Sequence, residues 1–227
     1  ARAEGLEAVL INSSGGLTGG DEMSWQAEVG AGARLTLSTQ ACERIYRARD
    51  GLAEQRATLT VGAGASLHWL PQETILFDGG ALSRRLDADL HAGGRLLAVE
   101  AVVLGRTAMN ETVRVGSLHD RWRIRREGQL VFADELRLDG ALADLGARAA
   151  ILSGRRAFAS LLLVAEDAAR FLEPVRAALG EWGGASAFEG KLFARVATPD
   201  GFSLRQALLP AIEVLRDNHP LPRVWRT

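Results

Sequence analysis

Short glycine-containing turns, each flanked by alternating apolar and polar residues, recur along the first part of the chain. Residues 29–37 (VGAGARLTL) return as residues 61–69 (VGAGASLHW), and looser copies lie at residues 90–98 and 126–132. Alternation with a period of two around such turns is typical of β-hairpins with one buried face. Copies spaced by about thirty residues predict an elongated, superhelical, solenoid-like stack of β-hairpins. An ordinary β-sandwich with several similar hairpins is the alternative.

The pattern changes after about residue 155, where segments with helical spacing alternate with strand-like segments. Pro174 lies inside the first helical segment and predicts a kink or a restart there, and Ser203 is the candidate N-cap of the second. We expect strands at 157–164 and 188–197, helices at 166–179 and 203–216, and a loop at 180–184. The sequence thus predicts a mainly β protein with two helices in its C-terminal half. We expect one domain over residues 1–227, with stacked hairpins in 1–155 and an α/β part in 156–227.

The composition is that of an ordinary globular protein. Hydrophobic residues make up 47% and charged residues 24%, and the formal net charge of −1 draws the whole molecule neither to nucleic acid nor to a membrane surface. Lys191 is the only lysine, which argues against lysine catalysis, and the single cysteine, Cys42, excludes an intramolecular disulfide and favours a reducing cytoplasm. No apolar run is long enough to span a bilayer. Because the chain begins with Ala1 rather than Met, we expect an N-terminus that has been trimmed.

Residues 15–21 (GGLTGGD) combine a glycine-rich segment with a carboxylate, which a phosphate cradle, a tight turn or a ligand site would use. The glycines fall as two doublets: Gly15, Gly16, Gly19 and Gly20. This is not the dinucleotide spacing GxGxxG, and Asp21 and Glu22 stand where a Walker loop needs Lys and Ser or Thr. The segment is therefore interpreted as a tight turn that presents Asp21. The Asp21 carboxylate can also accept hydrogen bonds from the amides of the turn itself.

No local pattern points to catalysis or to a tightly bound metal. The four histidines form neither an HxH pair nor an HExxH helix, and no GxSxG elbow occurs. What remains is a set of carboxylates in strand-like surroundings. Glu100 interrupts the apolar run 96–104, where a carboxylate is costly unless it is paired, hydrated or bound to a cation. Salt bridging is the simpler explanation for each of these carboxylates, since arginines are abundant and Arg106 is an obvious candidate partner. Glu111 and the pair at 134–135 are further candidates, either for salt bridges or for a shared hydrated interior.

Several strings along the chain resemble the UreD (also called UreH) family of urease accessory proteins. The first are GGLTGGD at 15–21, STQ at 38–40 and ERIYR at 43–47, which contains Tyr46. They continue with LHWLPQETILF at 67–77, which contains Pro71 and Gln72, and with LGR at 104–106, which contains Gly105 and Arg106 and precedes Glu111. The last is LPRVW at 221–225. The strings span essentially the whole chain in the family's order, so together they are specific, although each alone is weak. Two departures stand out. The several dozen residues that usually precede the glycine motif are absent, and Asn110 replaces the usual glycine before Glu111.

The resemblance implies a non-enzymatic, cytoplasmic scaffold with an elongated superhelical β fold and two helices. It implies a complex with UreF and the GTPase UreG on the urease apoprotein, no tightly bound cofactor, and a passage for transient Ni²⁺. The acidic residues that it places along the passage are Asp21, Glu100 and Glu135, with Glu111 as a fourth. Hydrated carboxylates suit such a passage because they release Ni²⁺, whereas Cys and His sites favour Cu²⁺ or Zn²⁺.

A β-rich carbohydrate-active hydrolase is the alternative from a different class. Glu100 and Glu135 would then serve as acid and base, about 5–5.5 Å apart in a retaining enzyme or about 6.5–9.5 Å apart in an inverting one. Nothing in the sequence supplies aromatic sugar platforms beside these acids, and the scaffold is therefore the leading hypothesis.

Overall fold

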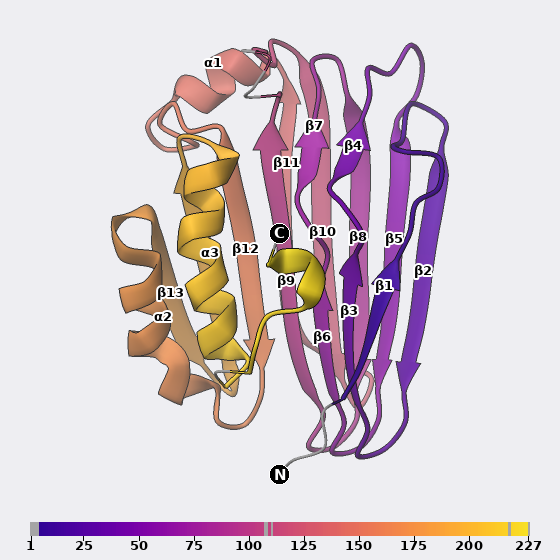
Figure 1. Ribbon diagram of the computed structural model, residues 1–227, viewed down its shortest axis with the longest axis vertical. Coiled ribbons are helices and arrows are strands. Elements are labelled where there is room, and N and C mark those ends of the chain that lie inside the picture. The colour runs from indigo at the N-terminus through magenta and orange to yellow at the C-terminus, as the bar shows by residue number, and fades with distance from the viewer. Residues whose placement is uncertain (1–4, 107–108, 110, 218, 227) are drawn as a thin grey trace.

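The structure, a computed structural model, describes residues 5–106, 109, 111–217 and 219–226. Two β-sheets face each other, and helices cover part of the outer face of one of them (Figure 1). In the described residues, sheet A contains β1 (Leu6–Leu10), β3 (Arg34–Thr39), β6 (Ser66–Leu70), β9 (Arg95–Leu104), β12 (Ala157–Val164), β14 (Lys191–Thr198) and β13 (Gly183–Phe188) in spatial order, with the short strands β4 (Glu43–Ile45) and β7 (Thr74–Leu76) beside them. Sheet B contains β11 (Gln129–Gly140), β10 (Gly116–Arg126), β8 (Ala81–Leu90), β5 (Ala53–Val61) and β2 (Glu22–Val29).

The chain coils between the two sheets, and successive coils stack in parallel. β2, β5 and β8 pair in parallel in sheet B, while β1, β3, β6 and β9 do so in sheet A. Equivalent positions of the sequence repeat become ladder partners, Val29 with Val61 and Val61 with Leu90. The predicted mainly β, solenoid-like stack is confirmed. In detail, the strands that flank the turns after Val29, Val61 and Leu90 lie in different sheets, so the stacked unit crosses between the sheets and is not a hydrogen-bonded hairpin. The turn at 127–128 differs, because it joins β10 and β11 as an antiparallel hairpin within sheet B.

Glycines at the turns allow the coils to stack closely. A Cβ on Gly62 would lie 2.7 Å from the carbonyl oxygen of Val29 and 2.8 Å from the amide nitrogen of Ala31, both in the preceding coil. Gly64 has a φ of +62°, a conformation that residues with side chains rarely adopt. The recurrence of glycine in the sequence therefore follows from the spacing of about 4.8 Å between paired strands.

Buried apolar side chains lie on both faces of sheet A. In β9, Leu97 and Val99 face the helices, whereas Leu96 and Ala98 face sheet B. The space between the sheets holds two separate apolar clusters. With the molecule oriented as in Figure 1, the lower cluster lies around the turns that end β2, β5 and β8, and the upper cluster lies around the ends of β4, β7 and β9.

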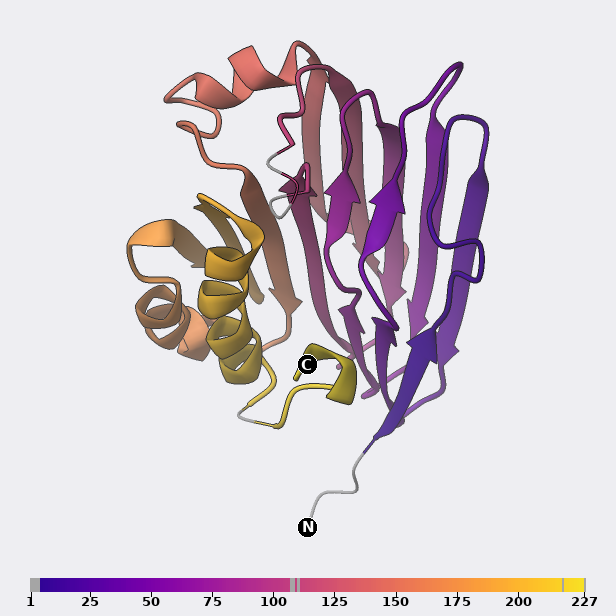
Figure 2. The same cartoon turned by 45° about the horizontal axis from the view of Figure 1, so that its top comes forward.

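The described C-terminal half contains α1 (Leu142–Ala147), α2 (Leu172–Leu179) and α3 (Gly201–Leu215), with 3₁₀ turns η2 (Ala168–Phe171), η3 (Gly180–Trp182) and η4 (Arg223–Trp225). Helices α2 and α3 pack along the β12–β14–β13 side of sheet A (Figure 2). They correspond to the two predicted helices, and α1 is additional. None of the helices in the described ranges has both the length and the apolar character needed to cross a bilayer.

The predicted element boundaries differ from the structure in a few places. The strand expected at 157–164 is β12, but the strand expected at 188–197 is divided, because β13 ends at Phe188 and β14 begins at Lys191. The loop expected at 180–184 holds η3 and the start of β13. Pro174 falls in the first turn of α2, where backbone N–H groups have no helical partner, so it needs no kink. The N-cap of α3 is Asp200 rather than Ser203, since an Asp200 carboxylate oxygen accepts the Ser203 backbone N–H at 2.8 Å.

Candidate functional site

Polar side chains cross the space between the sheets and separate the lower apolar cluster from the upper one. Gln55, Arg84 and Asp120 occupy paired positions on β5, β8 and β10 of sheet B. Glu100 and Ser160 are paired on β9 and β12 of sheet A. Two residues further along each of these strands, in either direction, the inward positions belong to the apolar clusters. We call these five residues the polar layer.

Arg84 is the centre of the polar layer because it pairs with two carboxylates. Its Nη1 lies 2.6 Å from Glu100 Oε2, and its Nη2 lies 2.5 Å from Asp120 Oδ2. Trp69 Nε1 donates to Glu100 Oε1 at 2.8 Å, and Arg84 Nη1 also donates to the Thr74 hydroxyl at 3.1 Å. The side chains of Arg84 and Glu100 are each 4% exposed, and that of Asp120 is 12% exposed. Two carboxylates thus share one guanidinium group in a nearly water-free position.

Burial and crowding of charge change the acidity of this cluster. Burial raises the pKa of Glu100 to about 7 and the neighbouring Asp120 adds to the rise, against the opposing effects of Arg84 and the Trp69 hydrogen bond. Asp120 Oδ1, Arg84 Nε and Gln55 Oε1 are buried without a hydrogen-bond partner among the described residues. Buried polar atoms are normally satisfied by protein or by water. The two oxygens can accept from a water or bind a cation, whereas the Arg84 Nε–H can only donate, for example to a water.

Glu100 is therefore the one predicted carboxylate that lies in the polar layer, and both Glu100 and Glu111 are paired with arginines. Arg84 pairs with Glu100, whereas Arg106 pairs with Glu111. Sequence reasoning missed Arg84 and Asp120. The signal for Arg84 is its position in the alternation Leu82-x-Arg84-x-Leu86, which puts it on the apolar face of the strand.

Glu135 lies on the opposite side of sheet B from Glu100. It is paired with Arg121 in the ladder and faces outward, where its carboxylate contacts His119 Nε2 at 2.8 Å and Arg123 Nη2 at 3.1 Å. Its neighbour Asp134 faces inward and binds Arg195 Nη2 with both oxygens at 2.8 Å, which joins the last strand of sheet B to β14. Because sheet B separates Glu100 from Glu135, the two cannot flank one sugar as an acid–base pair.

Asp21 lies at the upper end of the molecule and closes its own turn. Its Oδ2 accepts the Thr18 backbone N–H at 2.8 Å, and the side chain is exposed. The glycines of this turn have packing roles. A Cβ on Gly16 would lie 2.4 Å from the Tyr46 ring, and one on Gly19 would lie 2.1 Å from the Asp50 carbonyl oxygen. The glycine motif is thus a tight turn held against the next coil, which agrees with its interpretation from the sequence.

Glu111 also lies at the upper end, in an ion pair. Its Oε2 accepts hydrogen bonds from Arg106 Nε at 2.8 Å and from the Arg106 backbone N–H at 3.0 Å. The Arg106 hydrogen bond holds the pKa of Glu111 below its ordinary value, against a partial desolvation. Gly105 permits the approach, since its φ is +78° and a Cβ there would lie 2.8 Å from the Glu111 carbonyl oxygen.

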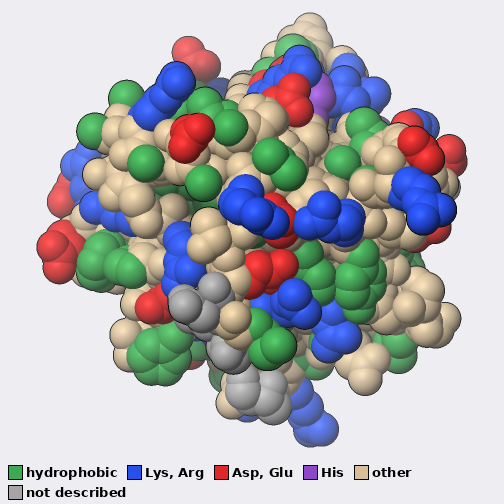
Figure 3. Space-filling model, turned by 90° about the horizontal axis from the view of Figure 1, so that it is seen from above, with side chains coloured by type: hydrophobic (Ala, Val, Ile, Leu, Met, Phe, Trp, Pro, Cys, Tyr) green, Lys and Arg blue, Asp and Glu red, His purple; other side chains and the backbone are tan. Residues whose placement is uncertain are grey.

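A pocket of about 640 Å³ at the upper end gathers several of the residues that carry the family resemblance. Arg106 lies over the Phe77 ring at 4.6 Å, and Tyr46 meets the same ring edge-on with centroids 5.2 Å apart. Arg47 and Arg114 both bind Asp78. Figure 3, a view onto this end, shows arginine and acidic side chains close together near its centre. Arginine and aromatic side chains of this kind are enriched in protein–protein interfaces.

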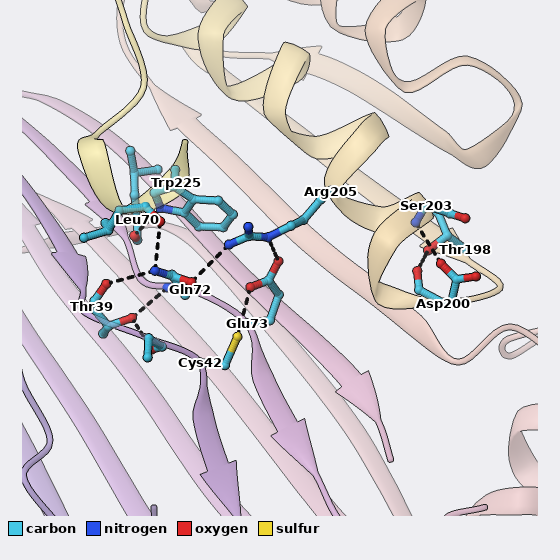
Figure 4. A network of polar contacts seen from close by, with 12 residues as sticks. Thr39, Cys42, Leu70, Gln72, Glu73, Thr198, Asp200, Ser203, Arg205 and Trp225 are labelled. Carbon is cyan, nitrogen blue, oxygen red and sulfur yellow. Dashed lines mark hydrogen bonds and ion pairs between the residues drawn. The ribbon is translucent and has the colours of Figure 1, made fainter. Parts of the chain in front are cut away.

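Gln72 and its neighbours fasten the C-terminal segment to sheet A (Figure 4). Arg205 of α3 donates to Gln72 Oε1 at 3.0 Å and to Glu73 Oε1 at 2.7 Å. Gln72 Nε2 in turn donates to the Val224 carbonyl at 3.0 Å, and Pro71 beside it is buried. Gln72 and Pro71 therefore have a structural role, which is to hold α3 and η4 in place.

Cys42 belongs to the same network and is not a reactive thiol. Its Sγ lies 3.4 Å from Glu73 Oε2, and burial, with the adjacent carboxylate, raises its pKa to about 12.

Over the part of the chain that the structure describes, no three His, Cys, Asp or Glu side chains are grouped as metal ligands. The carboxylates of the polar layer suit a weakly held, exchanging cation better than a permanent one.

The comparisons with known proteins agree on one family. A family model described as UreD urease accessory protein matches residues 1–226. The urease accessory protein UreD of Agrobacterium fabrum is 54% identical over 219 residues, which cover 96% of this chain and 77% of the relative. That of Rhizobium leguminosarum bv. viciae is 55% identical over 221 residues, 97% of this chain and 81% of the relative, and that of Mesorhizobium japonicum is 46% identical over 227 residues, with 98% and 81% covered. The chain belongs to the UreD family of urease accessory proteins.

Proposed function

We propose that this chain is a non-catalytic scaffold of urease maturation that bridges apo-urease to the UreF–UreG complex and conducts Ni²⁺ towards the urease active site. The polar layer is the observation that carries the proposal. It places two carboxylates and unpaired polar atoms inside a core that is otherwise apolar. A buried ion pair often contributes little to stability compared with an apolar replacement, so a polar layer in this position calls for a functional reason.

The chemistry of the layer supports transient binding of Ni²⁺. An arriving dication competes with the Arg84 guanidinium for Glu100 and Asp120, so each carboxylate always has a cation nearby. Because the pKa of Glu100 is raised to about 7, the carboxylate also exchanges protons near neutral pH, which weakens its hold on the metal. Oxygen ligands without thiolates release Ni²⁺ more readily than a Cys or His site does.

In this proposal the other three acidic residues lie where the route meets the surface. Asp21 and Glu111 are at the upper end, and Glu135 is on the outer face of sheet B. The upper pocket, with its arginine and aromatic residues, is the proposed docking surface for partner proteins in the cytoplasm. A docking role without metal transfer is the nearest rival.

Measuring urease activation by the assembled complex separates these two roles. Glu100→Ala and Asp120→Ala are expected to lower the rate of activation while the complex with urease, UreF and UreG remains intact on gel filtration. Glu54→Ala is the matched control, because Glu54 is a half-exposed acid on the outer face of sheet B that pairs with Arg56. The activation rate of Glu135→Ala shows whether the Ni²⁺ route continues on the outer face of sheet B. Normal activation by an intact complex carrying Glu100→Ala and Asp120→Ala together would leave docking as the only role.

A further inference from the structure

A second pocket, of about 1040 Å³, lies at the lower end of the molecule between sheet A and the C-terminal segment. Its walls come from the lower ends of β1, β3, β6 and β9, from η2 and from the residues after α3. Figures 1 and 2 show the C-terminal segment beside this end of the sheet. This lower pocket shares no residue with the polar layer or with the upper pocket.

The lower pocket has an excess of positive charge, although the chain as a whole carries a net charge of only −1. Its arginines are Arg34, Arg95, Arg170, Arg216, Arg223 and Arg226. Three carboxylates, of Glu7, Asp167 and Asp217, also line it. Twice as many guanidinium groups as carboxylates therefore face one cavity.

The aspartates are already occupied by two of the arginines. Arg95 pairs with Asp167 at 2.7 Å, and Arg170 pairs with Asp167 at 2.9 Å and with Asp217 at 3.0 Å. Among the described residues, the other four arginines form no ion pair with a carboxylate. Among the described residues, the cavity thus contains four guanidinium groups without an ion-pair partner, and the one further carboxylate in its lining is that of Glu7.

Arg216 shows the imbalance most clearly. It is partly buried, its Nη atoms contact the Thr36 hydroxyl, His68 Nδ1 and the Pro220 carbonyl, and its Nε has no partner among the described residues. Burial, followed by the charges of Arg216, Arg95, His219 and Arg34, lowers the pKa of the adjacent His68 to about 3. His68 is therefore held neutral mainly by burial, and the positive charges around it add to the effect.

We propose that the lower pocket binds a small molecule carrying two or more phosphate groups, with Arg34 and Arg216 among its ligands. Guanidinium groups match phosphate oxygens in a bidentate fork, and several of them from different strands suit a ligand with more than one phosphate. The volume fits a small-molecule site. This inference is independent of the nickel route, since it rests on different residues.

Isothermal titration calorimetry of the whole chain with inorganic pyrophosphate and tripolyphosphate tests the proposal. Wild-type protein is expected to bind one tripolyphosphate at low ionic strength, more tightly than pyrophosphate, with affinity that falls as salt is added. Arg34→Gln and Arg216→Gln are expected to weaken binding about tenfold or more, because each removes charge-assisted hydrogen bonds. Arg34 is exposed, so its variant keeps the test valid even if Arg216→Gln impairs folding.

The control variant is Arg137→Gln, which removes one arginine from the outer face of sheet B, away from the lower pocket. It should bind both phosphates as the wild type does. Absence of binding to the wild type would overturn the proposal, and so would equal weakening by Arg34→Gln and Arg137→Gln. Binding of triglutamate as tight as that of tripolyphosphate would also overturn it, because the site would then select acidic peptides rather than phosphates.

Discussion

Replacing Arg84 with methionine tests whether the polar layer is a dry ion cluster. Methionine keeps the unbranched aliphatic stem but removes the guanidinium group, which leaves Glu100 and Asp120 inside the core without their shared cation. Leaving a buried charge uncompensated costs roughly 3–5 kcal/mol. With a urea dependence of about 2 kcal/mol/M, the unfolding midpoint should fall by about 1.5–2.5 M.

Urea unfolding followed by tryptophan fluorescence is a suitable assay, because Trp69 and Trp122 are buried beside the layer. The loss should be smaller at pH 5.5 than at pH 7.5. Burial raises the pKa of Glu100 to about 7 even with Arg84 beside it, and removing Arg84 takes away a charge that lowers this pKa. The Glu100 carboxyl is therefore protonated and uncharged in the folded variant at the lower pH. The triple variant Arg84→Met/Glu100→Gln/Asp120→Asn should recover most of the lost stability, since it removes all three charges.

Arg56→Met is the matched control, because Arg56 is an exposed arginine on β5 whose partner is Glu54. It should shift the midpoint by less than about 0.5 M, since exposed ion pairs contribute little. If Arg84→Met lowers the midpoint no more than Arg56→Met does, the layer is freely hydrated and the reasoning from burial is wrong.

Two further predictions concern the turns and the pH dependence of stability. Gly19→Ala should lower the free energy of unfolding by about 1–3 kcal/mol, because a Cβ at this position would lie 2.1 Å from the Asp50 carbonyl oxygen. Gly30 has open space around it, so Gly30→Ala should change that free energy by less than about 0.5 kcal/mol. Comparable losses of stability in the two variants, measured by thermal unfolding, would contradict this. His68, whose pKa is lowered to about 3 by burial and by nearby arginines, takes up a proton below about pH 6.5 only on unfolding, so stability should fall as the pH drops. The loss from His68 is at most about 2 kcal/mol at pH 5 and should be absent in His68→Gln; a parallel pH dependence in both proteins would refute the assignment.

The repeating coils could be predicted from the sequence because alternation is a local property. A strand exposes successive side chains to opposite faces, so the repeated turns at 29–37 and 61–69 indicate stacked strands with one buried face. The same alternation is satisfied whether the strands beside a turn pair with each other or with the next copy. Only the ladder, with Val29 opposite Val61, shows that they pair with the next copy.

The candidate site was less predictable, because it depends on register. Asp134 and Glu135 are adjacent acids, and a shift of one residue in the pairing of β11 with β10 would exchange which of them faces inward. The sequence showed that Glu100 needs a partner, but that partner, Arg84, reaches it from the other sheet and is shared with Asp120.

By itself, the sequence determined the mainly β stack, the glycine turns, the two longer C-terminal helices and membership of the UreD family, since these follow from short-range patterns and from strings that resemble the family. The tertiary structure alone decided which carboxylate is buried with which arginine. It also brought arginines from β3, η2 and the C-terminal segment to one pocket. The physical reason is that charges interact through space, over a few ångströms, between residues that are far apart along the chain.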